Sequence, residues 1–459
     1  MLALLLGACR FFLVGMVLHF LVHTRFTFGL GWDINFVWAW KEMALVALFF
    51  FAAWEGWTYR SQMVHWLHHP RIFTLISLFL LTCLWQGIVV LVGEGTVRDL
   101  IISMRYSMLG YITILAMALG VRAIYQKKLG DTDAFAGFLG RWRSFFCILL
   151  LAALAWRVIA VIKPGTFTHL FGYDRTSVEG DIGTAPPVNY FTNLTHGYVR
   201  STFLFERPIH RGFYLIAFFP LFFVLMIRPR WGHFDAWLWL GIYSLNVFLT
   251  FSRAAWLAYA VLLGVMIIWQ LYGLRFFLSR RLWTILPFVL IGSIIAIKLF
   301  IPRSLRQRSF STTGHIQFTL QGLAMVAEKP LRGRGPSTAG PGSFHRGDLS
   351  TNFNPENQFL QLFIEFGIVG GVLWTILFFF MSCGWMLCLS SFPKKNLTDP
   401  LFQVWVALSL GGCGLAICGL FLHSFVDRMI VYPYAVLYGL SLGHVFAIYG
   451  KSAFLSIRS

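Results

Sequence analysis

The sequence predicts an all-α, polytopic membrane protein with about 12 transmembrane helices. Composition is the first reason: hydrophobic residues make up 58% of the chain and charged residues 12%, with a mean hydropathy of +0.71, whereas soluble domains carry about 25% charged residues. The second is that apolar runs of roughly 20 residues, the length that crosses a ~30 Å hydrocarbon layer, recur along the sequence. Because a backbone in lipid must satisfy its hydrogen bonds internally, these runs are predicted to be helices.

The predicted spans cover the chain from end to end and leave two long connections. No internal repeat or soluble segment separates them, so we expect a single integral membrane domain over residues 1–459. The long connections are residues 163–210 and 302–357, and both are expected to contain short helices. The spans are placed near residues 5–24, 35–54, 72–93, 100–123, 143–162, 211–227, 234–251, 254–273, 282–301, 358–388, 402–422 and 430–449.

Basic residues predict the orientation, because Lys and Arg accumulate in cytoplasmic connections. They gather in alternate connections, which we therefore place in the cytoplasm together with both termini. The two long connections then lie outside. The basic residues that set this orientation are Arg60, Arg71, Arg122, Lys127, Lys128, Arg141, Arg143, Arg228, Arg230, Arg275, Arg280, Arg281, Lys394 and Lys395.

The second outer connection, residues 302–357, has an excess of basic residues, although Lys and Arg are expected to accumulate on the cytoplasmic side. This excess suggests an anionic ligand. For Arg303, Arg306 and Arg308, contact with anionic lipid headgroups next to a helix end is an equal alternative. The net charge of +19 is spread among membrane connections, so we do not expect a nucleic-acid partner. The connection carries Arg303, Arg306, Arg308, Lys329, Arg332, Arg334 and Arg346 against Glu328, Asp348 and Glu356.

Cysteine and histidine spacings indicate neither a disulfide framework nor a metal site. All seven cysteines lie in predicted helices. No histidine pair has the i, i+4 spacing with an intervening glutamate that marks a zinc-protease helix. We therefore expect no catalytic metal ion and no other cofactor.

The segment 351–371 is the strongest candidate for chemistry. A polar loop that contains Pro355 leads directly into an apolar helix, with Glu356 at the boundary. A carboxylate at this place is a candidate catalytic base. Asn357 either orients that carboxylate or the acceptor, or satisfies backbone donors as a helix cap.

The sequence before this segment predicts a surface helix followed by a glycine-rich turn. Residues 316–328 have apolar positions at helical spacing and end before Lys329-Pro330, which predicts an amphipathic helix along the membrane surface. In the following Pro330–Pro336, glycines permit close backbone approach, and Arg332 and Arg334 can hold an anion. A solvated Gly/Pro turn is the alternative.

Further arginines are predicted at the outer ends of helices, where ionisable groups are usually functional. Arg253 lies between two apolar runs, so its guanidinium is expected at the outer mouth of the helix bundle. The alternative is that the side chain only extends to the membrane–water interface. Arg207 and Arg211 are four residues apart and share a face if the helix begins early enough. His210, beside Arg211, is the outer histidine expected to matter.

Other outer polar residues are interpreted as structural. Asp427 and Arg428 are expected to pair with each other in the last outer turn, next to His423. Scattered loop histidines are more often solvated than catalytic, and the residues interpreted in this way are His196, His315 and His345.

Together, these motifs resemble the O-antigen ligase and polymerase superfamily over roughly residues 200–450. The resemblance implies a GT-C type glycosyltransferase that takes a glycan from undecaprenyl diphosphate at the periplasmic face of the bacterial inner membrane. Ligases attach the glycan to lipid A core, whereas polymerases add it to another repeat unit. The motifs are Ser252-Arg253-Ala-Ala-Trp256, Lys329-Pro-Leu-Arg-Gly-Arg-Gly335, Glu356-Asn357-Gln-Phe-Leu360 and Glu365-Phe-Gly-Ile368.

One position departs from the pattern of the ligases. They usually have His-Asn-x-x-Leu where this chain has Glu356-Asn357, and that histidine is their proposed base. A glutamate side chain ordinarily has a pKa of about 4.3 and is a weaker base than histidine at neutral pH. We favour a ligase because the outer loops are long and basic enough to meet a phosphorylated lipid A core, and a polymerase remains the alternative.

The resemblance assigns roles to the candidate residues. Glu356 accepts the proton of the attacking sugar hydroxyl, and the anomeric centre inverts. Arg211 and Arg253 stabilise the diphosphate leaving group without a metal ion. Supporting contacts to diphosphate or acceptor are assigned to Arg207, His210, Arg332, Arg334 and Asn357.

The alternatives to a ligase or polymerase are a transporter of lipid-linked glycans and a peptidoglycan polymerase. A transporter of lipid-linked glycans usually binds its substrate near the bilayer midplane, whereas the polar residues here concentrate at the outer ends of the helices. A peptidoglycan polymerase of related shape is not expected to carry the Glu-Asn-x-x-Leu segment. We therefore favour the ligase or polymerase.

Overall fold

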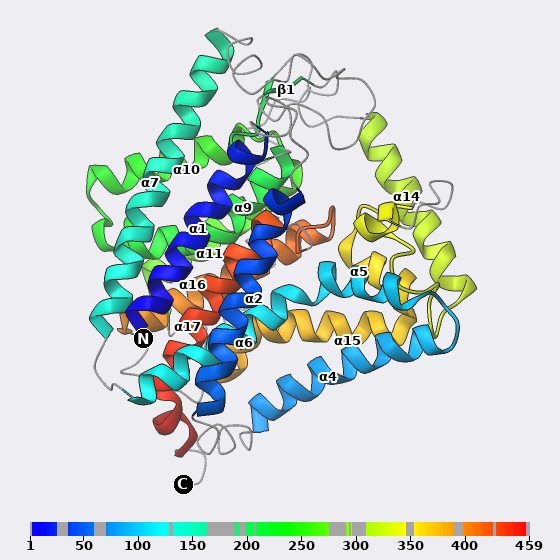
Figure 1. Ribbon diagram of the computed structural model, residues 1–459. Helices are drawn as coiled ribbons and strands as arrows, with labels where there is room; N and C mark the ends of the chain where they lie inside the picture. Colours follow the sequence, from blue (N-terminus) through cyan, green and yellow to red (C-terminus); the bar gives the residue numbers. More distant parts are fainter. Residues whose placement is uncertain are drawn as a thin grey trace.

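The described part of the chain is helical apart from one small ribbon (Figure 1). Strands β1 (Asn189–Phe191) and β2 (Val199–Ser201) pair antiparallel, with Tyr190 opposite Arg200. The computed structural model describes residues 2–24, 35–58, 70–127, 132–162, 189–191, 199–205, 208–274, 291–292, 295, 309–345, 353–389, 398–425 and 428–455.

The helices follow one another with short connections where these are described. In chain order they are α1 (Leu2–Thr24), α2 (Asn35–Thr58), α4 (Pro70–Leu91), α5 (Val97–Ser107), α6 (Leu109–Lys127), α7 (Thr132–Ile162), α9 (Pro208–Phe222), η4 (Phe223–Ile227), η5 (Arg228–Arg230), α10 (Phe234–Phe248), α11 (Arg253–Tyr272), α14 (Ser309–Glu328), η7 (Gly340–His345), α15 (Gln358–Leu389), α16 (Pro400–Gly419) and α17 (Arg428–Leu455).

Eight helices in the described residues are long and apolar enough to cross a membrane, and each coincides with a predicted span. A ninth candidate is the pair α5 and α6, which is bent by 58° at a short break. The eight are Leu2–His19, Phe73–Leu91, Asp133–Ile159, Pro208–Arg230, Arg253–Tyr272, Gln358–Ser382, Pro400–Gly419 and Arg428–Ile448.

The prediction of about 12 spans is therefore met only in part. Helix α10 has 15 residues, or about 22 Å at 1.5 Å per residue, which is too short to cross alone. Helix α2 is 24 residues long and carries the adjacent charged residues Lys41 and Glu42; it is not among the eight. The span predicted near 282–301 falls mostly outside the described residues, and the orientation stays a prediction.

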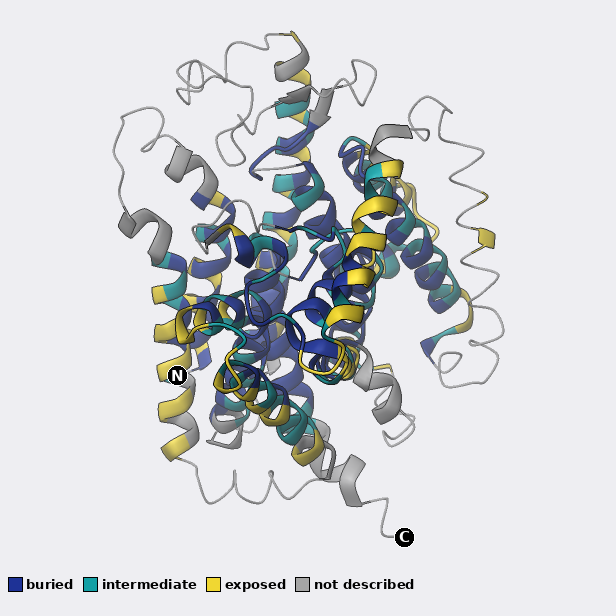
Figure 2. Cartoon of the chain, turned by 90° about the vertical axis from the view of Figure 1, so that its right-hand side faces the viewer, coloured by how far each residue is buried: buried dark blue, intermediate teal, exposed yellow. Residues whose placement is uncertain are grey.

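The centre of the bundle is formed by helices far apart in the sequence. In the span formed by α9, η4 and η5 and in that of α16, 78% of the residues are buried, and in that of α17 89%, against 17% in α4 and 22% in α7. Figure 2 shows this gradient from a buried centre to exposed outer helices. Side chains of α9 such as Phe213, Phe218 and Phe222 are fully enclosed, so α9, α16 and α17 form the inner helices and α4 and α7 the outer ones.

The helix predicted for residues 316–328 is confirmed as α14, which begins earlier, at Ser309, and ends at Glu328 as expected, while its predicted place along the membrane surface stays a prediction. Proline at position 330 disfavours the helical conformation of the residue before it. Helix α14 lies at the edge of the bundle (Figure 1) and packs against α15, where Gly322 approaches Leu360. It therefore flanks the start of α15, where the candidate catalytic segment lies.

Candidate functional site

The segment with the candidate base is fixed by hydrogen bonds at the start of α15. Asn357 Oδ1 accepts from the Leu360 N–H at 3.0 Å, which is the predicted cap, and its Nδ2 donates to the Leu420 carbonyl at 3.0 Å. Leu420 ends α16, so this residue joins two helix ends. Glu356 has a left-handed backbone with φ 50°, and its N–H donates to Asn354 Oδ1 at 3.2 Å.

The Glu356 side chain pairs with a histidine from α14. His315 Nδ1 lies 2.5 Å from Glu356 Oε2, and the two side chains are 32% and 30% exposed. This contact corrects the interpretation of His315 as a solvated loop histidine. The sequence signal that would have found it is its place on one helix face with Phe318 and Gly322, which requires knowing what that face packs against.

The glycine-rich turn after α14 docks into a break in α15. Gly367 has φ 67° and ψ −172° and interrupts the helix. The Arg334 N–H donates to the Ile364 carbonyl at 2.8 Å, and the Ile368 N–H donates to the Pro330 carbonyl at 2.7 Å. A Cβ atom on Gly367 would lie 2.2 Å from the Leu331 carbonyl oxygen, so the turn fits only against glycine. Two of the motifs identified in the sequence therefore form one structural unit.

A buried carboxylate lies inside this unit. Glu365 is 1% exposed and accepts from Ser103 Oγ at 2.9 Å and from Gln361 Nε2 at 3.1 Å. The backbone of Ser337 and Ala339, in the docked turn, also hydrogen-bonds to it. A buried carboxylate needs such donors. Glu365 thus holds α5, the turn and α15 together, a role that the sequence did not reveal.

The basic residues of the turn have carboxylate partners. Arg332 Nε lies 3.2 Å and Lys329 Nζ 2.5 Å from the two oxygens of Glu94, in the connection between α4 and α5. Arg334 pairs with Glu328. The side chains of Arg332 and Arg334 stay 51% and 33% exposed. Their contacts anchor the turn, and their predicted binding of an anion stays a prediction.

Arg211 is buried, whereas Arg253 is partly exposed. The Arg211 guanidinium donates to Ser201 of β2 and to Asn246 of α10. Arg253 follows the cap Ser252, whose hydroxyl accepts from the Ala255 N–H. Arg211 is therefore held among protein groups and Arg253 is the one of the two that reaches the surface.

The starts of α9 and α11 lie together. A Cβ atom on Gly212 would be 2.9 Å from the Ala255 Cβ, which places Arg211 and Arg253 on adjoining helix ends. His210, the first-turn neighbour of Arg211, is partly buried. Arg207 falls outside the described residues, as do Arg303, Arg306, Arg308, Arg346 and His196.

The end of α16 connects these arginines to the start of α15. Near the end of α16, Cys418 Sγ lies 3.9 Å from the carbonyl of Ala254, which follows Arg253 in α11. Two residues after Cys418, the Leu420 carbonyl accepts a hydrogen bond from Asn357 at the start of α15. The start of α11, the end of α16 and the start of α15 therefore meet at one end of the bundle, which we call the site end. Arg253 and Glu356 both lie there.

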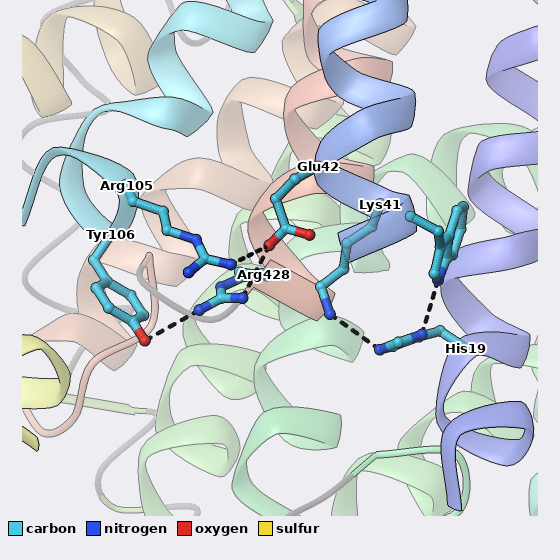
Figure 3. Close-up of polar contacts among 7 residues, drawn as sticks. His19, Lys41, Glu42, Arg105, Tyr106 and Arg428 are labelled. Carbon is cyan, nitrogen blue, oxygen red and sulfur yellow. Dashed lines mark hydrogen bonds and ion pairs between the residues drawn. The ribbon is translucent and has the colours of Figure 1, made fainter. Parts of the chain in front are cut away.

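A cluster of ion pairs around Glu42 links helices of the bundle to the start of α17. Glu42 Oε1 lies 2.8 Å from Arg105 and 2.9 Å from Arg428, and Arg428 also donates to the Tyr106 hydroxyl at 3.1 Å (Figure 3). Arg428 was expected to pair with Asp427, which lies outside the described residues. Its contact with Glu42 ties α17 to α2 and α5, because one carboxylate is shared by arginines from two helices.

Fold and site together define a mainly helical protein with eight candidate membrane spans in its described residues and with a carboxylate, an imidazole and arginines at one end of its bundle. Residues 236–375 match the model of a family described as O-antigen ligase. The match confirms the resemblance to the O-antigen ligase and polymerase superfamily, whose members are membrane enzymes of the glycosyltransferase type. No curated protein matches the chain.

The matched residues hold most of the site end. They include most of α10, all of α11 and α14, the docked turn and the start of α15, and thereby Arg253, His315 and Glu356. Helix α9 with Arg211 precedes the match, and α16 and α17 follow it. The part of the chain that resembles the family is therefore the part that carries the paired Glu356.

Proposed function

We propose that this protein is a glycosyltransferase that moves a glycan from undecaprenyl diphosphate to a sugar hydroxyl at the periplasmic face of the bacterial inner membrane. The observation that carries this proposal is the position of Glu356. It lies within the family match, at a helix start, with a side chain that is 30% exposed and so open to a substrate. Arg253 shares this end of the bundle.

The residues of the site end suit an inverting transfer. The acceptor hydroxyl attacks the anomeric carbon and its proton passes to the base at Glu356. The bond from the anomeric carbon to the diphosphate breaks, and the diphosphate leaves with the electron pair. Arg253 is placed to stabilise this charge at the surface. Arg211 contributes positive charge from the protein interior, where its guanidinium donates to Ser201 and Asn246.

We favour lipid A core as the acceptor. Its phosphates would meet the exposed parts of Arg332 and Arg334 next to α14. The alternative is a repeat-unit polymerase, in which a second lipid-linked glycan takes the place of the core. The glutamate at position 356, where ligases usually have histidine, favours this alternative.

Transfer by the purified protein in detergent tests the proposal. The donor is an undecaprenyl-diphosphate oligosaccharide, and the acceptor is either lipid A core or a second portion of donor. We expect glycan on lipid A core and no effect of EDTA, because arginines take the role of a metal ion. Lengthening of the donor alone would identify a polymerase, and no transfer to either acceptor would contradict the proposed function.

A further inference from the structure

We propose that His315 and Glu356 act as one catalytic pair, in which His315 Nε2 takes the proton of the acceptor hydroxyl and Glu356 orients the imidazole. This inference rests on the proposed glycosyl transfer. It reassigns the base from the carboxylate alone to a histidine on another helix. The pair is a contact between α14 and the start of α15, with His315 Nδ1 2.5 Å from Glu356 Oε2.

The packing of α14 on α15 sets the position of His315. A Cβ atom on Gly322 would lie 2.7 Å from Leu360, so the two helices approach closely there. Phe318 packs edge-on against Phe353 with ring centres 6.3 Å apart. His315, Phe318 and Gly322 have the i, i+3, i+7 spacing of one helix face. The face that docks α14 therefore also presents the imidazole to Glu356.

The backbone of Glu356 is held in a conformation that directs its side chain. A φ of 50° is uncommon for a residue other than glycine. The Asn354 side chain accepts from the Glu356 N–H, and Asn357 caps α15 directly after it. Uncommon backbone conformations that are held by their surroundings concentrate at functional sites. Glu356 is thus fixed on both sides.

The hydrogen bond sets the roles of the two ring nitrogens. Because Glu356 accepts at Oε2, the proton lies on His315 Nδ1, and in the neutral ring Nε2 is the acceptor. As the acceptor oxygen bonds to the anomeric carbon, its proton moves to Nε2 and the diphosphate leaves with the electrons of the broken bond. Glu356 stabilises the imidazolium that forms. Histidine is the side chain that most often serves as a general base in enzymes.

Other charged groups nearby are engaged elsewhere. On α14 and in the docked turn, the described ionisable side chains besides His315 form ion pairs of their own: Glu328 with Arg334, and Lys329 and Arg332 with Glu94. From the start of α15 and the segment before it, Glu356 is the described charged residue that faces the imidazole. The described charged groups of the basic turn therefore have ion-pair partners other than His315 and Glu356.

Variants of both residues test the pair in the transfer assay. His315→Gln keeps a donor for Glu356 but has no acceptor for the proton, so we expect kcat to fall about 100-fold or more. Glu356→Gln is expected to lower kcat less, and the double variant to be no slower than His315→Gln within about threefold. Gln317→Ala, an exposed neighbour on α14, is the matched control and retains the wild-type rate.

The pH profile separates a catalytic from a structural role. Any acid limb of wild-type kcat/KM that reports protonation of the base is expected to be missing from the residual rate of His315→Gln, because that variant has no imidazole. If His315→Gln keeps the wild-type rate while Glu356→Gln loses it, the pair is wrong and the carboxylate alone is the base. If wild-type protein transfers no glycan at all, the proposed function itself fails.

Discussion

At the scale of single residues, the structure separates side chains that hold the fold from those that meet a substrate. Glu356 and His315 are about one third exposed, whereas Glu365 is fully enclosed by its donors. Both glutamates belong to the motifs that the sequence singled out. Their sequence context is similar, so only the structure distinguishes the surface carboxylate from the buried one.

Glu365→Ala should destabilise the protein. The change leaves Ser103 and Gln361 as buried donors without their acceptor, which costs about 2 kcal/mol. The measurement is thermal unfolding of purified protein in detergent. Ser103→Ala, which removes one donor and keeps the carboxylate bonded, is the milder comparison. Equal melting temperatures for Glu365→Ala and wild type would contradict this assignment.

His423 should make stability depend on pH. Burial lowers the pKa of this imidazole, in the connection between α16 and α17, to about 4, and its Nε2 has no hydrogen-bond partner among the described residues. The folded state therefore binds a proton less readily than the unfolded state, where histidine has a pKa of about 6.5. This contribution is fully present above that pH and is lost as pH falls toward 4.

Melting curves of wild type and His423→Gln between pH 7 and about 4 test this dependence. The wild type should lose more of its melting temperature over this range than the variant. Parallel loss in both proteins would show that other groups cause the acid sensitivity.

At the scale of elements, the sequence predicted the helices better than their breaks and contacts. The end of α14 at Glu328 follows from Pro330, and the start of α15 follows from the polar loop before it. The break at Gly367 was not predicted, because the apolar run continues through it. Its cause is a backbone contact with Pro330, far away in the chain. The pairing of His315 was missed for the same reason.

Gly367→Ala should release the docked turn. Its Cβ would clash with the Leu331 carbonyl, and φ 67° disfavours alanine. We expect trypsin to cut after Arg332 and Arg334 much faster in the variant than in wild type, and transfer to fall as α14 loses its support. Gly241→Ala, where a Cβ meets open space, is the control. Equal protection in both variants would show that the turn docks without this glycine.

At the scale of the whole molecule, composition predicted the class of protein better than it predicted the number of membrane-spanning helices. Eight predicted spans coincide with described helices that are long and apolar enough to cross a membrane, and a bent pair is a ninth candidate. Helix α10 was predicted to span because its apolar run looks longer in sequence than the helix that forms. The meeting of α11, α15 and α16 at the site end depends on packing between distant segments, which hydropathy does not encode.

The most direct test of the central claim is the initial rate of glycan transfer by wild type, Glu356→Ala and Arg253→Ala under identical conditions. Asp133→Asn, which changes an exposed carboxylate in the first turn of α7, serves as the control. We predict that both variants transfer glycan much more slowly than wild type while folding normally, and that the control keeps the wild-type rate. Full activity of Glu356→Ala would contradict the account, because the start of α15 would then be structural only.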